Sequence, residues 1–450
     1  MEETIVAIST PPGEGGVGIV RLSGSDAIRI GRILFRAHSP LGKRIRHVEY
    51  GKVYARNREI DTGLAWFLEA AHSYTGEDTV EISCHGSSLI LEMVVEAAIS
   101  TGARLAAPGE FTRRAFLNGN IDLLQAEAVI DLIQANNECG LEDAYGLAGG
   151  RLSKDVSLLK SGLVRALARV EVGLDFSEED IDPTSRQDIS DRLQTTIDHA
   201  LSIYNTFEAG RRRQQGYLIV LAGQPNVGKS TLLNSLLGED RAIVTEIPGT
   251  TRDLIEGKTI WGGKSIRIVD TAGMRDSADP IENEGIKRAR KVVSEADIVM
   301  VVVDSSTGNE DIEFWLSDIV DSERCILVLN KVDLPHSDMR LHTKMSYGAV
   351  VEISALTGFG RENLINKVLE TLPIDQAVDG VILSRQRHYD CLRRMIDFTQ
   401  AALLQLSSGE PDECIAAELQ EALLCLGQLL GENVGEDVLN SIFSEFCIGK

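Results

Sequence analysis

A glycine-rich segment, residues 223–230 with the sequence GQPNVGKS, constrains the fold of this chain more than any other feature. An apolar run from Leu218 to Ala222 precedes it, and a second run from Leu232 to Leu237 follows it. A strand, a glycine-rich turn and a helix in this order make a P-loop, whose backbone N–H groups close around phosphate groups at the helix N-terminus. The pattern therefore predicts a nucleotide-binding α/β domain.

Each residue type in this loop has a predicted role. Lys229 offers a point charge to the β- and γ-phosphates, and the hydroxyl group of Ser230 is a ligand for Mg²⁺. The neighbouring residues expected to contact the nucleotide are Asn226, Val227, Gly228 and Thr231.

The segment Asn330-Lys331-Val332-Asp333 predicts which base is bound. The carboxylate of Asp333 can accept hydrogen bonds from N1–H and the exocyclic amine of guanine, a donor pair that adenine lacks. We therefore expect GTP, in a domain similar to those of Ras-like GTPases. Its other expected contacts are Thr245, Glu246, Ile247, Pro248, Gly249, Thr250, Thr251, Asp270, Thr271, Ala272, Gly273, Ser354, Ala355 and Leu356. Thr251 should join Ser230 at Mg²⁺, and Asp270 should reach the ion through water.

The group that orients the attacking water stays open at this stage. Ras-type enzymes carry glutamine directly after the segment Asp-Thr-Ala-Gly, whereas this chain has Met274 there. A thioether cannot orient water, so a polar group nearby must do so. The loop that follows offers Arg275, Asp276, Asp279, Glu282 and Glu284.

Short apolar strands alternate with helical stretches from about residue 217 to 373, as in a doubly wound α/β domain. The expected strands are 218–222, 266–270, 298–304, 326–330 and 350–354. On both sides of this domain the apolar period becomes helical, at Leu152, Val156, Leu159, Leu163, Ala166 and Val170 and again at Leu419, Leu423, Leu426 and Leu430. Each helical segment has an apolar stripe that needs a partner, so we expect the two to pack as one discontinuous domain.

The chain is thus predicted to be a multidomain protein with an α+β N-terminal domain, a discontinuous helical domain and an inserted Ras-like α/β P-loop domain. The predicted boundaries are 1–117 for the N-terminal domain, 118–213 and 376–450 for the two helical parts, and 214–375 for the inserted G domain. Strand-like runs at 18–22 and 79–83 and a helix at 90–99 are expected in the N-terminal domain.

Charge and cysteine content limit the partners and the compartment. A formal net charge of −23 opposes long-range attraction to nucleic acid, so an RNA contact must be local or shared with a partner. Two basic groups, Arg211–Arg213 and the residues around Arg387, fit either solvated helix faces and domain tethers or an RNA contact. Seven scattered cysteines and no long apolar run lead us to expect a cytoplasmic protein without a disulfide framework, a zinc site or a membrane span.

Three blocks outside the GTPase motifs resemble one family, the MnmE (TrmE) tRNA-modification GTPases, over essentially the whole chain. They are TPPG at 10–13 with GGVGIVRLSG at 15–24, PGEFT at 108–112 with RAFLN at 114–118, and CIGK at 447–450. A generic GTPase fold explains none of them.

The resemblance implies how hydrolysis proceeds. Glu282 would act on the attacking water as the catalytic residue. Potassium, held by Asn226, Thr245, Ile247 and Thr250, would supply the positive charge that an arginine finger supplies in other GTPases.

The resemblance further implies a tetrahydrofolate derivative bound by Arg21, Glu81, Asn120 and Lys450, although the family commonly has lysine where this chain has Asn120. It implies a homodimer formed through the N-terminal domain and a heterotetramer with an FAD-dependent MnmG/GidA-family protein. The complex would install an aminomethyl or carboxymethylaminomethyl group on carbon 5 of the tRNA wobble uridine. The alternative is a GTPase switch in RNA or ribosome assembly, with a similar G domain.

Overall fold

The computed structural model describes residues 3–43, 47–175, 183–238, 255–270, 292–307, 322–335, 348–373 and 380–450. The chain divides into two compact units. The first unit comprises Met1–Gln134, Ala144–Tyr204 and Gln386–Lys450, and the second comprises Ala135–Asp143 and Asn205–Arg385. Within the described ranges, no helix has the length and apolar character needed to cross a membrane.

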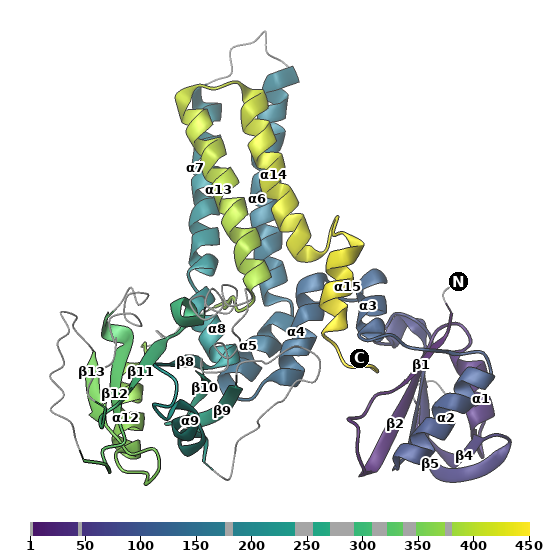
Figure 1. Cartoon of the computed structure of the whole chain (residues 1–450). Coiled ribbons are helices and arrows are strands. Elements are labelled where there is room, and N and C mark those ends of the chain that lie inside the picture. Colours follow the sequence, from purple (N-terminus) through teal and green to yellow (C-terminus); the bar gives the residue numbers. More distant parts are fainter. Residues whose placement is uncertain are drawn as a thin grey trace, which may run out of the picture. The chain divides into compact units, whose positions relative to one another are not determined.

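The first unit begins with a mainly antiparallel sheet of seven strands in the order β3-β4-β5-β6-β2-β1-β7. The strands are β1 (Ile5–Ile8), β2 (Gly15–Ser23), β3 (Phe35–Ala37), β4 (Glu49–Ala55), β5 (Arg58–Leu68), β6 (Thr79–Gly86) and β7 (Arg104–Leu105). Alternate residues of β6, among them Val80 and Ile82, point into a core covered by helices α1 (Ala27–Leu34) and α2 (Ser88–Ser100) (Figure 1). A strand with one buried face requires this alternation.

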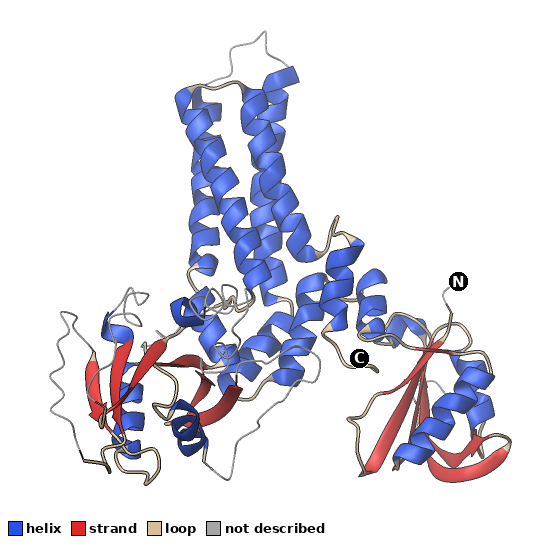
Figure 2. Cartoon of the chain, in the orientation of Figure 1, coloured by secondary structure: helices blue, strands red, loops and turns tan. Residues whose placement is uncertain are grey.

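Four long helices form a bundle in the same unit, as Figures 1 and 2 show. They are α6 (Arg151–Asp175), α7 (Pro183–Tyr204), α13 (Gln386–Ser408) and α14 (Asp412–Leu430). The stripe of α6 expected from the sequence, Leu152 to Val170, is buried. The α14 stripe is shifted, because Leu419 and Leu426 are buried with Leu429, whereas Leu423 and Leu430 are only partly covered.

Shorter helices connect the sheet to the bundle. They are α3 (Glu110–Leu117), α4 (Leu123–Gln134), α5 (Glu138–Ala148) and the C-terminal α15 (Glu436–Ser444), and the boundary between the two units passes through α5. Leu123 and Ile130 of α4 share a core with Phe443 of α15, and Phe116 of α3 packs against that ring with centroids 6.4 Å apart. Segments more than 300 residues apart in the chain therefore form one core.

A buried carboxylate links α4 to the bundle. Glu127 of α4 accepts hydrogen bonds from Nε and Nη2 of Arg387, at 2.9 and 2.6 Å, and lies 2.6 Å from Nε2 of His388. Nη1 of Arg387 donates to the Gln428 carbonyl of α14 at 3.0 Å. Burial alone would raise the pKa of Glu127, but the charges and hydrogen bonds of His388 and Arg387 outweigh it and hold the pKa far below its ordinary value.

The second unit contains a six-stranded sheet in the order β13-β12-β11-β8-β10-β9, in which only the β9–β10 pair is antiparallel. The strands are β8 (Tyr217–Ala222), β9 (Ile255–Trp261), β10 (Lys264–Asp270), β11 (Ile298–Asp304), β12 (Cys325–Asn330) and β13 (Ala349–Glu352). Helices α9 (Lys229–Leu237) and α12 (Arg361–Thr371) cover one face, a second apolar core lies on the other, and α8 (Phe207–Gln215) precedes β8. Helices around a mostly parallel sheet confirm the predicted α/β class.

The five strands expected in this sheet are present, with three differences. Most begin one or two residues earlier than predicted. The last ends at Glu352, because the chain turns at Ser354, whose N–H donates to the Phe359 carbonyl. The edge strand β9 was not predicted, since its sequence IEGKTIW contains glycine and lysine and lacks a continuous apolar run.

Removing the Glu127 carboxylate should destabilise the helical part of the first unit. In Glu127→Ala the partly buried Arg387 and the buried His388 lose the carboxylate that pairs with them, for which we expect a cost of about 3–5 kcal/mol. Hydrogen exchange of the α4 and α13 amides measures this loss. Glu171→Ala, at an exposed position of α6, is the matched control. It should change the stability of this part by less than about 0.5 kcal/mol.

The same measurement has a pH dependence with a definite sign. Because the folded-state pKa of Glu127 is lowered, its contribution is complete above the unfolded pKa of about 4.3 and is lost as pH falls toward the lower folded value. The stability difference between parent and Glu127→Ala should therefore shrink below about pH 4. A constant difference down to pH about 2 would contradict this account.

Candidate nucleotide-binding site

The predicted P-loop lies at the carboxyl end of β8, the edge at which open α/β sheets bind ligands. Both of its glycines lie where neighbouring atoms leave no room for a side chain. A Cβ at Gly223, with φ of 142°, would overlap the Val302 carbonyl oxygen, and one at Gly228, with φ of 97°, would overlap the side-chain amide of Asn330. Only glycine combines these φ angles with such contacts, so the pattern that predicted the loop has a steric basis.

Lys229 begins α9 and is buried, with 4% of its surface exposed. Its Nζ donates to the carbonyl oxygens of Gly223 and Gln224, at 2.9 and 2.7 Å. The ammonium group is therefore held inside the loop at the helix N-terminus, where a positive charge faces the position expected for phosphate groups.

Ser230, the next residue of α9, meets the end of β10. Its Oγ donates to Oδ2 of Asp270 at 2.8 Å, and Asp270 is fully buried. A hydroxyl and a carboxylate in contact give a hard oxygen pair of the type that binds Mg²⁺ beside nucleotide phosphates. These two residues fit the predicted ion, which would neutralise charge on the phosphate groups.

The buried side chain of Asn330 joins three loops. Its Nδ2 donates to the Val227 carbonyl of the P-loop at 2.8 Å, and its Oδ1 accepts from the backbone N–H of Ala355 at 2.9 Å. Asn330 is 2% exposed, so both bonds lie away from solvent. One amide therefore fixes the phosphate loop relative to both segments predicted to hold guanine.

Lys331, the next residue, has a positive φ of 65°, and its side chain bonds two other segments at this sheet edge. Its Nζ donates to the Asn226 carbonyl at 2.9 Å and to Oδ2 of Asp304 at 2.6 Å. Burial tends to raise the pKa of Asp304, but hydrogen bonds from Lys331 and Ser306 hold it below its ordinary value. Sequence reasoning missed Asp304, although its place at the end of the apolar strand 298–303 put it at the same sheet edge.

Asp333 and Leu356 are exposed, and Leu356 has 81% of its surface accessible. Ser354 is buried and its Oγ accepts from the N–H of Thr357 at 3.2 Å, which shapes the loop before α12. The Asp333 carboxylate is exposed at this edge, where its lone pairs can accept hydrogen bonds from a base. On the P-loop side, Asn226 and Thr231 are exposed as well.

The remaining predicted nucleotide contacts lie outside the described residues. They are Thr245, Glu246, Ile247, Pro248, Gly249, Thr250, Thr251, Thr271, Ala272 and Gly273. The predicted catalytic residue Glu282 and its alternatives Arg275, Asp276, Asp279 and Glu284 lie outside them as well. The structure thus brings together the phosphate loop, Asp270 and the two base loops of the predicted site.

The predicted folate residues lie in the first unit, and two of them, Arg21 and Lys450, contact Phe111. Nε of Arg21 donates to Oε1 of Glu81 at 2.6 Å across paired strands, and the guanidinium lies 5.6 Å from the Phe111 ring centroid. The backbone N–H of Phe111 donates to the Lys450 carbonyl at 3.2 Å. The chain end and a polar pair on the sheet are therefore neighbours.

Asn120 lies at the other end of α3, and a tyrosine connects it to this cluster. Its Nδ2 donates to the carbonyls of Ser73 and Tyr74, at 3.2 and 3.1 Å, and the Tyr74 hydroxyl donates to Thr112 at 3.1 Å. Burial raises the pKa of Tyr74, while the bond to Thr112 and the charge of Arg21 act in the opposite direction. Tyr74 was missed because no motif marks it in the sequence.

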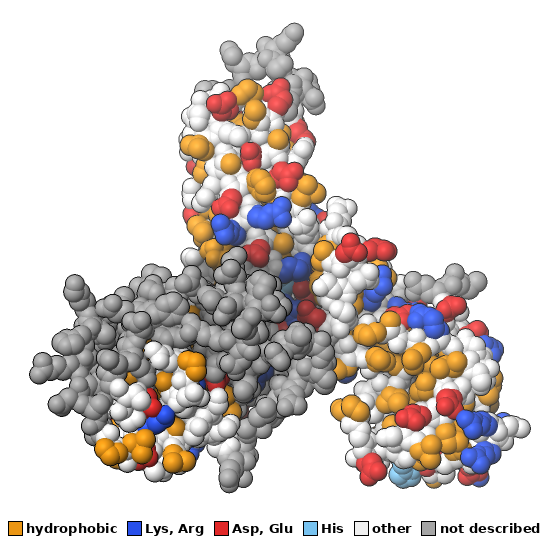
Figure 3. Space-filling model, viewed as in Figure 1, with side chains coloured by type: hydrophobic (Ala, Val, Ile, Leu, Met, Phe, Trp, Pro, Cys, Tyr) orange, Lys and Arg blue, Asp and Glu red, His pale blue; other side chains and the backbone are white. Residues whose placement is uncertain are grey.

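The basic groups considered for RNA are largely paired within the protein. Arg213 bonds Asp143 with Nε–Oδ2 at 2.6 Å, Arg211 lies 3.3 Å from Asp297, and Arg387 bonds Glu127. On the face in Figure 3, acidic and basic side chains of the described residues are interspersed and form no broad basic area. These observations favour the interpretation of Arg211–Arg213 as part of a domain tether.

Two family models match this chain. The model described as the GTP-binding protein TrmE N-terminus matches residues 4–120, and the model described as the MnmE helical domain matches residues 123–447. Among curated proteins, the tRNA modification GTPase MnmE of Geobacter sulfurreducens is 41% identical over the full length of both chains. The chain belongs to the MnmE family.

Other MnmE proteins give the same result. The protein of Chloroflexus aurantiacus is 42% identical over the whole of both chains, and that of Roseiflexus sp. is 41% identical over all of this chain and 99% of its own. Among solved structures, the G domain of the T. maritima FeoB iron transporter covers 34% of this chain and 98% of its own at 28% identity, with a TM-score of 0.27.

Breaking the Asn330 bridge should loosen the MnmE nucleotide site. In Asn330→Ala the Val227 carbonyl and the Ala355 N–H lose their buried partner, at a cost of about 1–3 kcal/mol. We expect the dissociation constant of a fluorescent GDP analogue to rise by about 10- to 100-fold, because each 1.4 kcal/mol is tenfold. Asn234→Ala on the exposed side of α9 is the control, and equal affinities for all three proteins would contradict the bridging role.

Proposed function

We propose that this chain hydrolyses GTP and, by doing so, drives modification of carbon 5 of the tRNA wobble uridine. The observation that carries the proposal is the Asn330 bridge, which joins the phosphate loop to the segments predicted to bind guanine. Lys229 and the pair Ser230–Asp270 stand at the same sheet edge, where they suit phosphate groups and Mg²⁺. Membership of a family of tRNA modification GTPases supports the coupling to tRNA.

Within this proposal the nucleotide contacts keep the roles that the sequence predicts. Asp333 accepts hydrogen bonds from guanine, and the loop 354–356 contributes a backbone N–H toward the guanine oxygen. Thr251 and Ser230 are ligands of Mg²⁺. Glu282 activates the attacking water, since Met274 cannot. Potassium, bound by Asn226, Thr245, Ile247 and Thr250, supplies fixed positive charge where charge develops in the transition state.

The N-terminal cluster is proposed to bind a tetrahydrofolate one-carbon derivative. Arg21 suits a carboxylate of the glutamate tail, and Glu81 suits donors on the pterin ring. The Phe111 ring lies beside the Arg21 guanidinium, and the Phe111 N–H bonds the Lys450 carbonyl, so Lys450 is close to this pair. Asn120 is tied to the backbone of residues 73 and 74, so it would support the pocket wall through Tyr74.

We further propose the assembly in which the reaction takes place. The chain forms a homodimer through its N-terminal domain and a heterotetramer with an FAD-dependent MnmG/GidA-family protein in the cytoplasm. Since Arg211, Arg213 and Arg387 pair with carboxylates of this chain, that partner supplies much of the tRNA surface. The domains act within the boundaries 1–117, 118–213 with 376–450, and 214–375.

Hydrolysis should depend on potassium. We expect steady-state GTP hydrolysis to be about 10²-fold faster in potassium than in matched sodium buffer, the order of effect of one fixed group that stabilises transition-state charge. Asn226→Ala should lose this stimulation, and Glu282→Ala should bind GTP normally while hydrolysing it about 10²- to 10⁴-fold more slowly. Equal rates in both salts, with an active Glu282→Ala, would rule out this mechanism.

Folate binding separates the proposed function from a switch in RNA or ribosome assembly, which has no need of a one-carbon donor. Tetrahydrofolate at about 100 times its dissociation constant should stabilise the chain by about 2.7 kcal/mol and raise its melting temperature. Arg21→Ala should abolish the shift, whereas Arg36→Ala, an exposed arginine on β3, should keep it. No shift with the parent chain would favour the assembly switch.

A further inference from the structure

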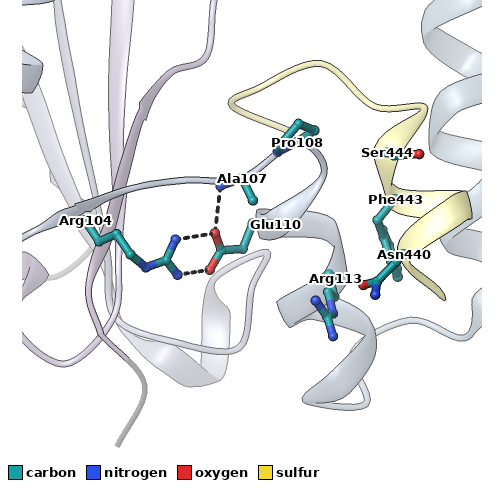
Figure 4. Close-up of a pocket in the computed structure, with 8 residues that line it drawn as sticks. All are labelled: Arg104, Ala107, Pro108, Glu110, Arg113, Asn440, Phe443 and Ser444. Carbon is teal, nitrogen blue, oxygen red and sulfur yellow. Dashed lines mark hydrogen bonds and ion pairs between the residues drawn. The ribbon is translucent and has the colours of Figure 1, made fainter. Parts of the chain in front are cut away.

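A cavity of about 330 Å³ lies in the first unit where the segment after β7 meets helices α3 and α15 (Figure 4). It is lined by Arg104, Ala107, Pro108, Glu110, Arg113, Asn440, Phe443 and Ser444. Its volume is at the lower end of the range for small-molecule sites. None of the four proposed folate residues lines it, so it is distinct from that cluster.

Two charged groups of the lining neutralise each other. Oε2 and Oε1 of Glu110 accept from Nη1 and Nη2 of Arg104, at 3.0 and 2.5 Å, and Glu110 also accepts from the Ala107 N–H and from Arg114. Burial tends to raise the pKa of Glu110, but these bonds outweigh it and hold the pKa below its ordinary value. Glu110 and Arg104 therefore have little capacity left for a ligand.

Arg113 is different. Its Nε is shielded from solvent and makes no hydrogen bond, and its guanidinium has no ion-pair partner among the residues that the structure describes. Arg113 of α3 and Asn440 of α15 both line the cavity, as Figure 4 shows. Because Arg113 borders the cavity, its guanidinium can bond an acceptor placed there.

We propose that this cavity binds the carboxylate or phosphate group of a small organic anion. The fork of Arg113 would hold two oxygens of the anion, the geometry that guanidinium groups favour. The Asn440 amide would donate from α15, and Pro108 and Phe443 would form the apolar wall for the body of the ligand. Acidic residues Glu436 and Asp437 begin α15, so recognition relies on hydrogen-bond geometry more than on net charge.

The site joins segments that are far apart in the chain. α3 follows the N-terminal sheet, and α15 ends just before the chain terminus. A bound anion would bridge Arg113 to Asn440 and so link the two. The occupant would therefore stabilise the packing of the C-terminal segment on α3, independently of GTP and of folate.

The test uses the full chain saturated with GDP and Mg²⁺, so that the P-loop is closed to added phosphate. Isothermal titration with glutarate and, separately, with inorganic phosphate should show saturable binding of at least one of them at one site per chain. Binding of glutarate alone identifies a carboxylate ligand, and binding of phosphate alone identifies a phosphate ligand. Arg113→Gln should weaken binding by about 10- to 100-fold, the value of one charge-assisted hydrogen-bond pair.

Further variants keep the result interpretable. Asn440→Ala, at an exposed position of α15, should weaken binding less. Arg165→Gln, which replaces an exposed arginine of α6, should leave binding unchanged. No saturable binding of either anion, or equal binding by Arg113→Gln and the parent, would overturn the proposal. Loss of the tetrahydrofolate shift in Arg113→Gln would overturn the separation from the folate site.

Discussion

One side-chain amide organises the nucleotide site. Asn330 ends β12 and bonds both the P-loop and the Ala355 segment, so three loops that approach from different strands share a single buried support. Parallel strands deliver their carboxyl ends to one sheet edge but do not fix how the loops there are spaced. The amide, with one donor and one acceptor face, sets that spacing. Lys331 adds a second tie between the P-loop and Asp304.

In the first unit, too, a buried polar side chain joins segments that are far apart in the chain. Glu127 holds Arg387 and His388 at the point where the chain re-enters the bundle after the inserted unit. Tyr204, which ends α7 on the outgoing side, stacks on Tyr389 with ring centroids 4.4 Å apart. An insertion of this length interrupts one domain, and paired side chains at its entry and exit keep the two halves of the bundle together.

The sequence predicted the parts of the fold that depend on local chemistry. The P-loop and the Asn330-to-Asp333 segment could be located because their glycines, charges and strand–helix context are local, and the helical stripes followed from apolar spacing. Asp304 and Tyr74 were missed because what distinguishes them is a neighbour far along the chain, Lys331 and Arg21. The strand β9 was missed for a local reason, because its sequence lacks a continuous apolar run, although it pairs with the adjacent β10. Arg113 is likewise one of two adjacent arginines in the sequence. Only packing distinguishes it from Arg114, whose Nη1 and Nη2 bond Glu77, Glu110 and the Glu3 carbonyl.

The most direct test of the account is reconstitution of the reaction on RNA. Transcribed tRNA would be incubated with this chain, an FAD-dependent MnmG/GidA-family protein, a tetrahydrofolate one-carbon donor and either GTP or a non-hydrolysable GTP analogue. Nucleosides from the digested tRNA would then be identified by mass spectrometry. The account predicts a wobble uridine modified at carbon 5 with GTP and little or none with the analogue. Equal yields with both nucleotides, or no modified uridine with GTP, would contradict a function in which hydrolysis drives tRNA modification.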